Sequence, residues 1–209
     1  MVSKNGCFIV FEGIDGSGKS TQISLLKEYI EEHSINCMTT MEPSNGPIGT
    51  LLRQFLSGRI KGEETTLTAL FAADRLDHLN NPVNGIRKLL EDGIAVISDR
   101  YVFSNYAYQS VSVPLEWIMK CNEMANETVR PDCHIFIDVA PETAMDRVSK
   151  GRHQTDIYET LDRLTDVRER YLDLIHRMED VENIIIIDGN RPEKEIADDI
   201  WAKVCHYFV

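Results

Sequence analysis

The residues from Gly13 to Thr21 have the types and the spacing that phosphate chemistry requires. They fit the pattern G-x-x-x-x-G-K-[ST], in which glycines let backbone N–H groups turn toward a phosphate. Lys19 places a positive charge on the β- and γ-phosphates, and the Ser20 hydroxyl coordinates magnesium. The alternative is a glycine-rich turn without a ligand, which the strand-like run before the loop and the amphipathic stretch after it disfavour. The segment predicts a site for ATP or GTP with Mg²⁺.

A second candidate group, Asp99-Arg100-Tyr101, follows an apolar run. Asp99 could hold magnesium directly or through water, and Arg100 could form forked hydrogen bonds with phosphate oxygens. A structural Asp–Arg pair explains the same residues equally well.

Aromatic and amide side chains suggest a place for a nucleobase. Phe71 and Arg75 are four residues apart and share a face if the segment is helical, so they could stack on a base and hydrogen-bond to it. Burial habits alone favour a core position for Phe71. Asn105 and Gln109 could read a base edge, and Tyr108 could fill the space beside a sugar carbon. The alternative is a polar helix surface with one buried tyrosine.

The basic stretch from Val148 to His153 lies between two helix-like segments. It could form a lid over ATP, at about residues 148–160. Charge alone favours a solvated loop.

Short apolar runs alternate with longer amphipathic stretches. The runs are typical of strands buried on both faces of a parallel sheet, and the alternation predicts an α/β fold. Predicted strands are Cys7–Phe11, Cys37–Met41, Ile94–Ile97, Cys133–Ile137 and Ile184–Ile187. Predicted helices are Lys19–His33, Ile48–Leu56, Glu63–Leu79, Val83–Glu91, Leu115–Glu127, Pro141–Lys150, Thr160–Met178 and Glu193–Tyr207.

Acidic residues end several of these runs, namely Glu12, Glu42, Asp99, Asp138 and Asp188. Ligands of open parallel sheets bind at the carboxyl ends of the strands, so these acids lie where chemistry is expected. For Asp138 and Asp188 we favour a simpler role as caps of the next helix.

Length and charge limit the remaining possibilities. The chain of 209 residues predicts a single domain, residues 1–209, with the phosphate loop at 13–21. A net charge of −12 argues against nucleic acid and against an anionic membrane surface as partners. Five scattered cysteines without C-x-x-C spacing indicate buried free thiols, and no apolar run is long enough for a membrane helix, so we expect a cytoplasmic protein.

The size of the chain suits a small kinase acting on a metabolite. No Asn-Lys-x-Asp segment, which a GTPase needs to read its base, is present, and a large ATPase needs a longer chain. Phosphoryl transfer to an acceptor that is itself a phosphate requires several arginines or lysines rather than a general base.

Taken together, these segments resemble the thymidylate kinase family over nearly the whole chain. The resemblance rests on Phe11–Thr21, Glu42-Pro43, Leu52-Arg53, Phe71–Arg75, Asp99–Tyr101, Ser104-Asn105, Ala107–Gln109, Arg130–Asp132 and Tyr158-Glu159. It implies the P-loop NTPase fold, with a five-stranded parallel sheet flanked by helices on both faces and a short lid. It also implies ATP and dTMP as substrates, Mg²⁺ as cofactor and a homodimer.

The resemblance implies roles for individual residues. Catalytic residues are expected to be Asp15, Lys19, Arg100 and Arg152. ATP is expected to contact Gly13, Ile14, Asp15, Gly16, Ser17, Gly18, Lys19, Ser20, Thr21, Lys150 and Arg152. Residues expected at dTMP are Asp15, Glu42, Pro43, Arg53, Phe71, Arg75, Arg100, Ser104, Asn105, Tyr108 and Gln109, and those expected around Mg²⁺ are Ser20, Asp99 and Glu159.

Members of this family carry a catalytic arginine either in the phosphate loop or in the lid. This chain has Gly16 and Ser17 in the loop, so it is similar to the kind that uses the lid, with Arg152 as the candidate. It departs from many bacterial members at Met41 and Ile157, where they carry arginine. A deoxynucleoside kinase with Glu42 as its base, or a nucleotide-binding regulator without turnover, are the alternatives.

Overall fold

The computed structural model describes residues 6–151 and 160–208. A five-stranded, all-parallel sheet lies at its centre, in the order β2-β3-β1-β4-β5. The strands are β1 (Phe8–Glu12), β2 (Cys37–Met41), β3 (Ala95–Asp99), β4 (Cys133–Asp138) and β5 (Ile184–Asp188). The predicted strands and the predicted P-loop NTPase fold are confirmed, with ends shifted by at most two residues. The expected burial on both faces is wrong for the edge strands β2 and β5, where Met38 and Ile186 are exposed.

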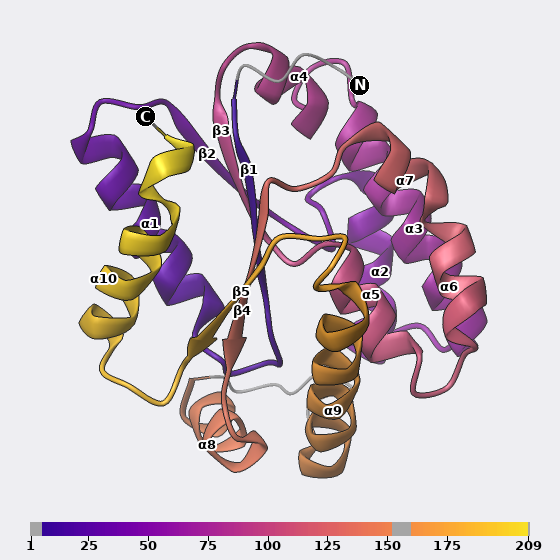
Figure 1. The fold of residues 1–209 in the computed structure, drawn as a ribbon. Coiled ribbons are helices and arrows are strands. Elements are labelled where there is room, and N and C mark those ends of the chain that lie inside the picture. The colour runs from indigo at the N-terminus through magenta and orange to yellow at the C-terminus, as the bar shows by residue number, and fades with distance from the viewer. Residues whose placement is uncertain (1–5, 152–159, 209) are drawn as a thin grey trace.

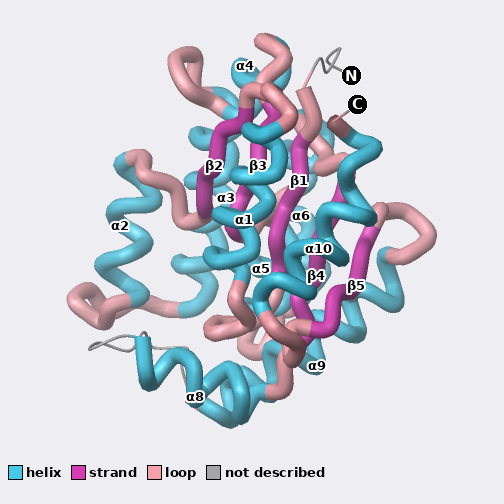
Figure 2. The backbone as a smooth tube through the Cα atoms, turned by 90° about the vertical axis from the view of Figure 1, so that its left-hand side faces the viewer, coloured by secondary structure: helices cyan, strands magenta, loops and turns pink. Residues whose placement is uncertain are grey.

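Helices lie on both faces of the sheet (Figure 1). Helices α1 (Lys19–Glu32) and α10 (Glu193–Val204) cover one face, and Figure 2 shows them in front of the strands. Helices α3 (Glu64–Asn80), α5 (Val102–Gln109), α6 (Leu115–Cys121), α7 (Glu123–Thr128) and α9 (Leu161–Met178) cover the other face. The remaining helices are α2 (Pro47–Leu56), α4 (Ile86–Glu91), α8 (Pro141–Gly151) and a 3₁₀ turn at Cys205–Tyr207.

The central strand explains where the phosphate loop lies. Every residue of β1 is buried, and its neighbours β3 and β4 are almost entirely buried as well. Phe11 pairs with Asp99 of β3, and Glu12 pairs with Phe136 of β4. The loop that follows β1 therefore emerges between the ends of two other strands, where polar groups from β3 lie beside it.

Helix α5 is the main element that the sequence did not predict. All eight of its residues are buried, including the polar Ser104, Asn105 and Gln109, so burial does not follow the apolar periodicity by which an amphipathic helix is recognised. The segment from Leu115 to Glu127, predicted as one helix, is instead two helices that meet at Asn122.

Two predicted helix caps are wrong. Both carboxylate oxygens of Asp138 accept hydrogen bonds from Arg168 of α9, at 2.7 and 2.9 Å. Asp188 accepts from the backbone N–H of Asn190 at 2.9 Å, and α10 begins later, after Pro192. Of the five cysteines, which we predicted to be buried, only Cys133 is fully buried. No helix in the described part of the chain is long and apolar enough to cross a membrane.

Candidate functional site

The phosphate loop connects the central strand β1 to helix α1. Gly13, Gly16 and Gly18 have φ angles of +143°, +80° and +96°, which residues with a Cβ adopt only under strain. At Gly16 a Cβ would also lie 2.3 Å from the carbonyl oxygen of Ala144. Helix α1 begins at Lys19 without a side-chain cap, so the positive end of its dipole faces the loop.

The ammonium group of Lys19 lies against the backbone of the phosphate loop. Its Nζ donates to the carbonyl oxygens of Gly13 at 3.1 Å and of Ile14 at 3.0 Å. Burial and the nearby Arg100 cation lower the pKa of Lys19 to about 8, although Asp99 and Asp15 act in the opposite direction. The ammonium is thus oriented toward the loop and is poorly solvated, which makes an anionic ligand a favourable partner.

Ser20 and Asp99 fit the expected magnesium position. The Ser20 hydroxyl donates to Asp99 Oδ2 at 3.1 Å, and Asp99 Oδ1 is buried without a hydrogen-bond partner among the described residues. Hydroxyl and carboxylate oxygens suit Mg²⁺, which takes few protein ligands and completes its shell with phosphates and water. The described residues contain no cluster of three or more histidine, cysteine or acidic side chains that could enclose a metal.

Arg100, directly after β3, connects the loop to helix α5. Its NH1 donates to the Gly13 carbonyl oxygen at 3.0 Å and to the Ser104 hydroxyl at 3.1 Å. Its NH2 donates to Asp15 Oδ1 at 2.6 Å and to the Tyr108 hydroxyl at 3.2 Å. The backbone of Arg100 has a φ angle of +75°, an unusual value for a residue with a side chain. Such strain at a site of this kind suggests a functional role for the residue.

Asp15 faces Arg100 and Tyr108 from within the loop. The Tyr108 hydroxyl donates to Asp15 Oδ2 at 2.7 Å and accepts from the Asp15 backbone N–H at 3.1 Å. Burial raises the pKa of Asp15, but the Arg100 and Lys19 cations outweigh it and hold this pKa at about 2. Asp15 is therefore an ionised hydrogen-bond acceptor at neutral pH.

Below these residues, a buried carboxylate supports the start of α5. Glu12 accepts from the backbone N–H of Tyr101 at 3.0 Å, from the Ser104 hydroxyl at 2.5 Å and from the Tyr171 hydroxyl at 2.9 Å. Burial raises its pKa, while Ser104, Arg100, Tyr171 and Tyr101 oppose the rise. Neither Tyr171 nor this role of Glu12 was predicted.

Two cavities adjoin each other at the phosphate loop. The loop cavity, about 690 Å³, is lined by Asp15, Gly16, Ser17, Gly18, Lys19, Ser20, Thr21, Gln22, Met41, Glu42, Asp99, Arg100, Arg147, Val148, Gly189, Arg191, Glu193 and Ile196. The side cavity, about 220 Å³, is lined by Asp15, Met41, Glu42, Pro43, Arg53, Leu56, Phe71, Arg75, Arg100, Tyr101, Ser104, Asn105, Tyr108 and Gln109. Asp15, Met41, Glu42 and Arg100 line both.

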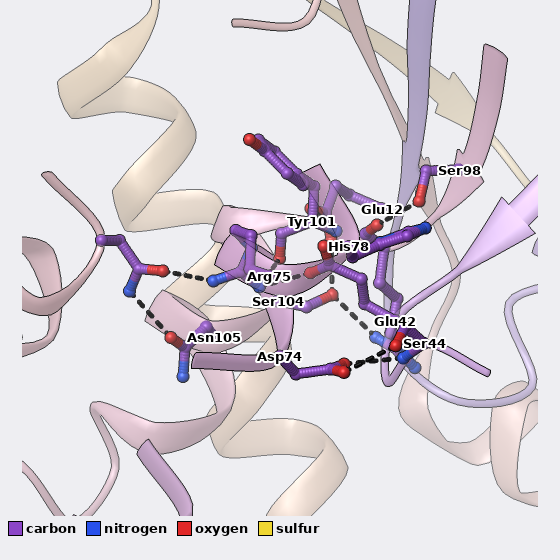
Figure 3. A network of polar contacts seen from close by, with 12 residues as sticks. Glu12, Glu42, Ser44, Asp74, Arg75, His78, Ser98, Tyr101, Ser104 and Asn105 are labelled. Carbon is purple, nitrogen blue, oxygen red and sulfur yellow. Dashed lines mark hydrogen bonds and ion pairs between the residues drawn. The ribbon is translucent and has the colours of Figure 1, made fainter. Parts of the chain in front are cut away.

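The side cavity has a buried ion pair in its wall (Figure 3). Arg75 NH2 lies 2.6 Å from Glu42 Oε2, and both side chains are almost fully buried. His78 Nδ1 lies 3.3 Å from Glu42 Oε1, and its Nε2 lies 2.7 Å from the Thr40 hydroxyl. Because Glu42 is held by Arg75 and His78, it is not available as a general base for a hydroxyl acceptor.

Neighbouring hydrogen bonds fix the rest of this wall. Asp74 accepts from the backbone N–H and the hydroxyl of Ser44, at 2.7 and 2.6 Å (Figure 3). Arg53 NH1 donates to the Pro43 carbonyl oxygen at 2.9 Å. Phe71 is half-buried and faces the side cavity, so its position differs from the core position that burial habits favoured.

The structure thus brings all the residues expected at dTMP around one cavity, and most of the residues expected at ATP around the other. Gly13, Ile14 and Lys150 do not line the loop cavity. Lys150 is exposed, and its Nζ lies 2.6 Å from Asp146 Oδ2. Val148 to Gly151 form the last turn of α8, so the predicted lid begins inside a helix. Arg152, Glu159 and Ile157 lie outside the described residues.

Two basic residues of the loop cavity were missed by the sequence analysis. Arg147, on α8, donates from NH2 to the carbonyl oxygen of Gly189 at 3.1 Å. Arg191 lies 2.7 Å from Asp199. Both belong to segments without a recognisable motif, although Arg147 directly precedes the basic stretch that we took as the lid.

The parallel sheet, the loop at the end of its central strand and the adjoining cavities define a P-loop protein of the kind that brings two ligands together. The family model described as "Thymidylate kinase" matches residues 11–200, and the chain therefore belongs to the thymidylate kinase family.

Curated relatives agree with this assignment. A protein of Symbiobacterium thermophilum named thymidylate kinase is 38% identical over 202 residues, which cover 92% of this chain and 90% of that one. A probable thymidylate kinase of Methanobrevibacter smithii is 37% identical, with 96% and 95% of the two chains covered. Another, of Methanocaldococcus jannaschii, is 38% identical, with 90% and 89% covered.

Proposed function

We propose that this protein transfers the γ-phosphoryl group of ATP to dTMP, which gives dTDP and ADP. The observation that carries the proposal is the junction of the two cavities at Asp15 and Arg100. A phosphoryl group passes between two bound anions, so both binding sites must meet at a cationic group. Arg100 is such a group, and Lys19 lines the loop cavity together with it.

In this proposal the loop cavity binds ATP. Lys19 and the loop N–H groups would hold the β- and γ-phosphates, and Ser20 and Asp99 would hold Mg²⁺, to which the family resemblance adds Glu159. When bound, Mg²⁺ supplies further positive charge at the transferred phosphate. Arg152 and Lys150 approach from the lid, and Arg152 neutralises the charge that develops in the transition state.

The side cavity binds dTMP. Phe71 stacks on the thymine ring, with Arg75, Asn105 and Gln109 at its edge. Arg53 and Arg100 hold the acceptor phosphate through forked hydrogen bonds. Tyr108 occupies the space that a ribose 2′-hydroxyl needs, while Asp15, Glu42, Pro43 and Ser104 complete the wall.

Beyond the site, we propose that the protein is located in the cytoplasm, that it forms a homodimer and that it consists of a single domain. The family resemblance supports the dimer, and the absence of a long apolar segment in the sequence supports the location. Neither point carries the functional proposal.

An acceptor panel tests the function. The protein is incubated with Mg-ATP and with dTMP, thymidine, dCMP or dUMP in turn, and ADP formation is measured. We expect dTMP to have the highest kcat/KM. Faster turnover of thymidine would indicate a deoxynucleoside kinase. Binding of ATP and dTMP without ADP formation would indicate a regulator.

A further inference from the structure

Helix α9 packs along helix α5, which carries four residues of the side cavity (Figure 1). The face of α9 toward α5 includes Arg163, Val167 and Tyr171, which are spaced four residues apart and so lie on one side of the helix. Tyr171 contacts the start of α5, where its hydroxyl lies 2.7 Å from the hydroxyl of Ser104. Arg163 contacts the other end of α5, and it lines neither cavity.

Arg163 holds the carboxyl-terminal end of α5. Its NH2 donates to the backbone carbonyl oxygen of Tyr108 at 2.7 Å. Tyr108 is the second-to-last residue of α5, so this oxygen belongs to the last turn, where a helix needs donors from outside itself. A guanidinium is a strong donor for this purpose, and its charge also interacts favourably with the negative end of the helix dipole.

The side chain of Tyr108 is held at its opposite end. Its hydroxyl donates to Asp15 Oδ2 at 2.7 Å and accepts from Arg100 NH2 at 3.2 Å. Arg163 is itself anchored, because its backbone N–H donates to the hydroxyl of Thr160, the cap of α9, at 3.3 Å. The ring of Tyr108 therefore cannot move away from the side cavity without disturbing a contact at one of its two ends.

The resistance of this ring to displacement matters for an acceptor that differs by one hydroxyl group. A binding pocket rejects an analogue with an added hydroxyl by only about 10²-fold. Where the rejection is steric, it cannot exceed the free energy needed to displace the side chain that stands in the way. For Tyr108 that free energy includes the contact between its backbone and Arg163.

We infer that Arg163 is a positioning residue for sugar selectivity, because it fixes the backbone of Tyr108 and thereby keeps the tyrosine ring where it excludes a ribonucleotide acceptor. The inference rests on the proposed function, since it requires the sugar of the acceptor to lie against Tyr108. It gives α9 a part in the choice between deoxyribose and ribose, although no residue of that helix lines the side cavity.

The test measures kcat/KM for dTMP and for ribo-TMP, with Mg-ATP as the donor. Arg163→Met keeps a long side chain and removes the guanidinium. We expect the preference for dTMP over ribo-TMP to fall by roughly 5- to 50-fold, mainly because kcat/KM for ribo-TMP rises. KM for ATP should change by less than about threefold. If the preference is unchanged, or if both nucleotides lose kcat/KM by the same factor, Arg163 only supports the fold and the inference is overturned.

Arg170→Met is the matched control, because it makes the same substitution on the same helix. Arg170 is exposed and lines neither the loop cavity nor the side cavity, so its variant should keep the wild-type preference. Tyr171→Phe removes a hydroxyl that contacts Ser104 and Glu12, and should lower kcat/KM for the two nucleotides alike. A loss of preference in either variant as large as that in Arg163→Met overturns the specific role of Arg163.

A double-mutant cycle connects the effect to the tyrosine ring. In the Tyr108→Ala background the ring is absent, so Arg163→Met should cause no further fall in the preference. A further fall of the same size would mean that Arg163 acts without the ring, and it overturns the inference. Arg163→Gln serves where the methionine variant fails to fold, and circular dichroism checks every variant.

Failure of the proposed function is seen before Arg163 is changed. A wild-type protein that does not phosphorylate dTMP overturns the proposed function as a whole. A wild type without a preference for dTMP over ribo-TMP, or a Tyr108→Ala variant that keeps this preference, overturns the steric role of Tyr108. When these measurements come out as expected, an unchanged preference in Arg163→Met counts against Arg163 alone.

Discussion

Arg100 NH2 lies 2.6 Å from Asp15 Oδ1, and these two residues face both cavities. The pair forms the boundary between the proposed donor and acceptor. Arg100 also reaches Gly13 and Ser104, so one guanidinium holds the loop, the helix α5 and the acid in a fixed relation. Lysine offers a single charged point instead of a planar fork.

We therefore expect Arg100→Lys to lower kcat/KM for dTMP by roughly 10²- to 10³-fold, as loss of a pre-organised charge contact does. Steady-state kinetics measure the effect. Arg168→Lys is the matched control, because Arg168 makes a similar forked contact with Asp138 away from both cavities. Equal losses in the two variants would contradict a special role for Arg100.

The pKa of Lys19, about 8, predicts a pH dependence. The ammonium is present below this pH and lost above it, so kcat/KM for ATP should be level near neutrality and fall above about pH 8. The pH dependence of initial rates at low ATP measures this limb. A level profile up to pH 10 would contradict the low pKa.

The free energy of unfolding should rise above about pH 8, where kcat/KM for ATP falls. The unfolded chain binds the Lys19 proton more tightly, with an ordinary pKa of 10.5. Between the two pKa values the unfolded state holds more protons, so this group makes the free energy of unfolding rise with pH. Urea unfolding of the wild type and of Lys19→Met, compared at pH 7.5 and 9.5, isolates the contribution, which should be absent from the variant.

The basic residues proposed for ATP and those that line the loop cavity should fall into two kinetic classes. Arg152→Ala should lower kcat by roughly 10³-fold or more, as removal of an arginine finger does. Arg147→Ala should instead raise KM for ATP, because Arg147 is held against Gly189 in the wall of the loop cavity. Lys150→Ala is the comparison, since Lys150 is exposed and paired with Asp146. A large loss of kcat in Lys150→Ala alone would assign the transition-state charge to Lys150.

Tyr108 combines two functions that mutation can separate. Its ring packs against the Arg100 guanidinium, with 4.9 Å from the ring centroid to Cζ, and its hydroxyl binds Asp15. Tyr108→Ala should admit ribonucleotides and lower the preference for dTMP over ribo-TMP. Tyr108→Phe should keep that preference, because the ring remains, but should lower kcat through loss of the Asp15 contact. An unchanged preference in Tyr108→Ala would contradict the steric role.

Much of the fold could be predicted because buried parallel strands are continuous apolar runs. Cys133–Ile137 of β4 illustrates this, since only His134 interrupts it and all five residues are buried. The edge strand β5 was recognised by the same kind of apolar run, although Ile186 is 53% exposed there. Helix α5 could not be predicted in the same way, because its tertiary position buries Asn105 and Gln109 along with its apolar residues. Hydrophobic periodicity says nothing about a helix whose polar side is also buried.

The residues of the candidate site also fall into those that could be predicted from the sequence and those that could not. Residues within short motifs, such as Lys19 and Arg100, could be identified because the chemistry depends on neighbouring positions. Tyr171 acts through a contact with Glu12, which is distant in the sequence, so no local pattern marks it. Asp138 was misassigned for the same reason, since its partner Arg168 belongs to another helix.

The φ angle of +75° at Arg100 is an unfavourable backbone conformation that the contacts of its side chain offset. A left-handed backbone costs a residue with a Cβ roughly 1–2 kcal/mol, and glycine avoids that cost. Arg100→Gly would remove this cost, but it would also remove the ion pair with Asp15 and the hydrogen bonds to Gly13 and Ser104, so we expect the variant to be both less stable and inactive. The unfavourable backbone conformation is therefore retained together with the side chain whose contacts offset it, and no single substitution at this position relieves the strain without breaking the connection between the loop and helix α5.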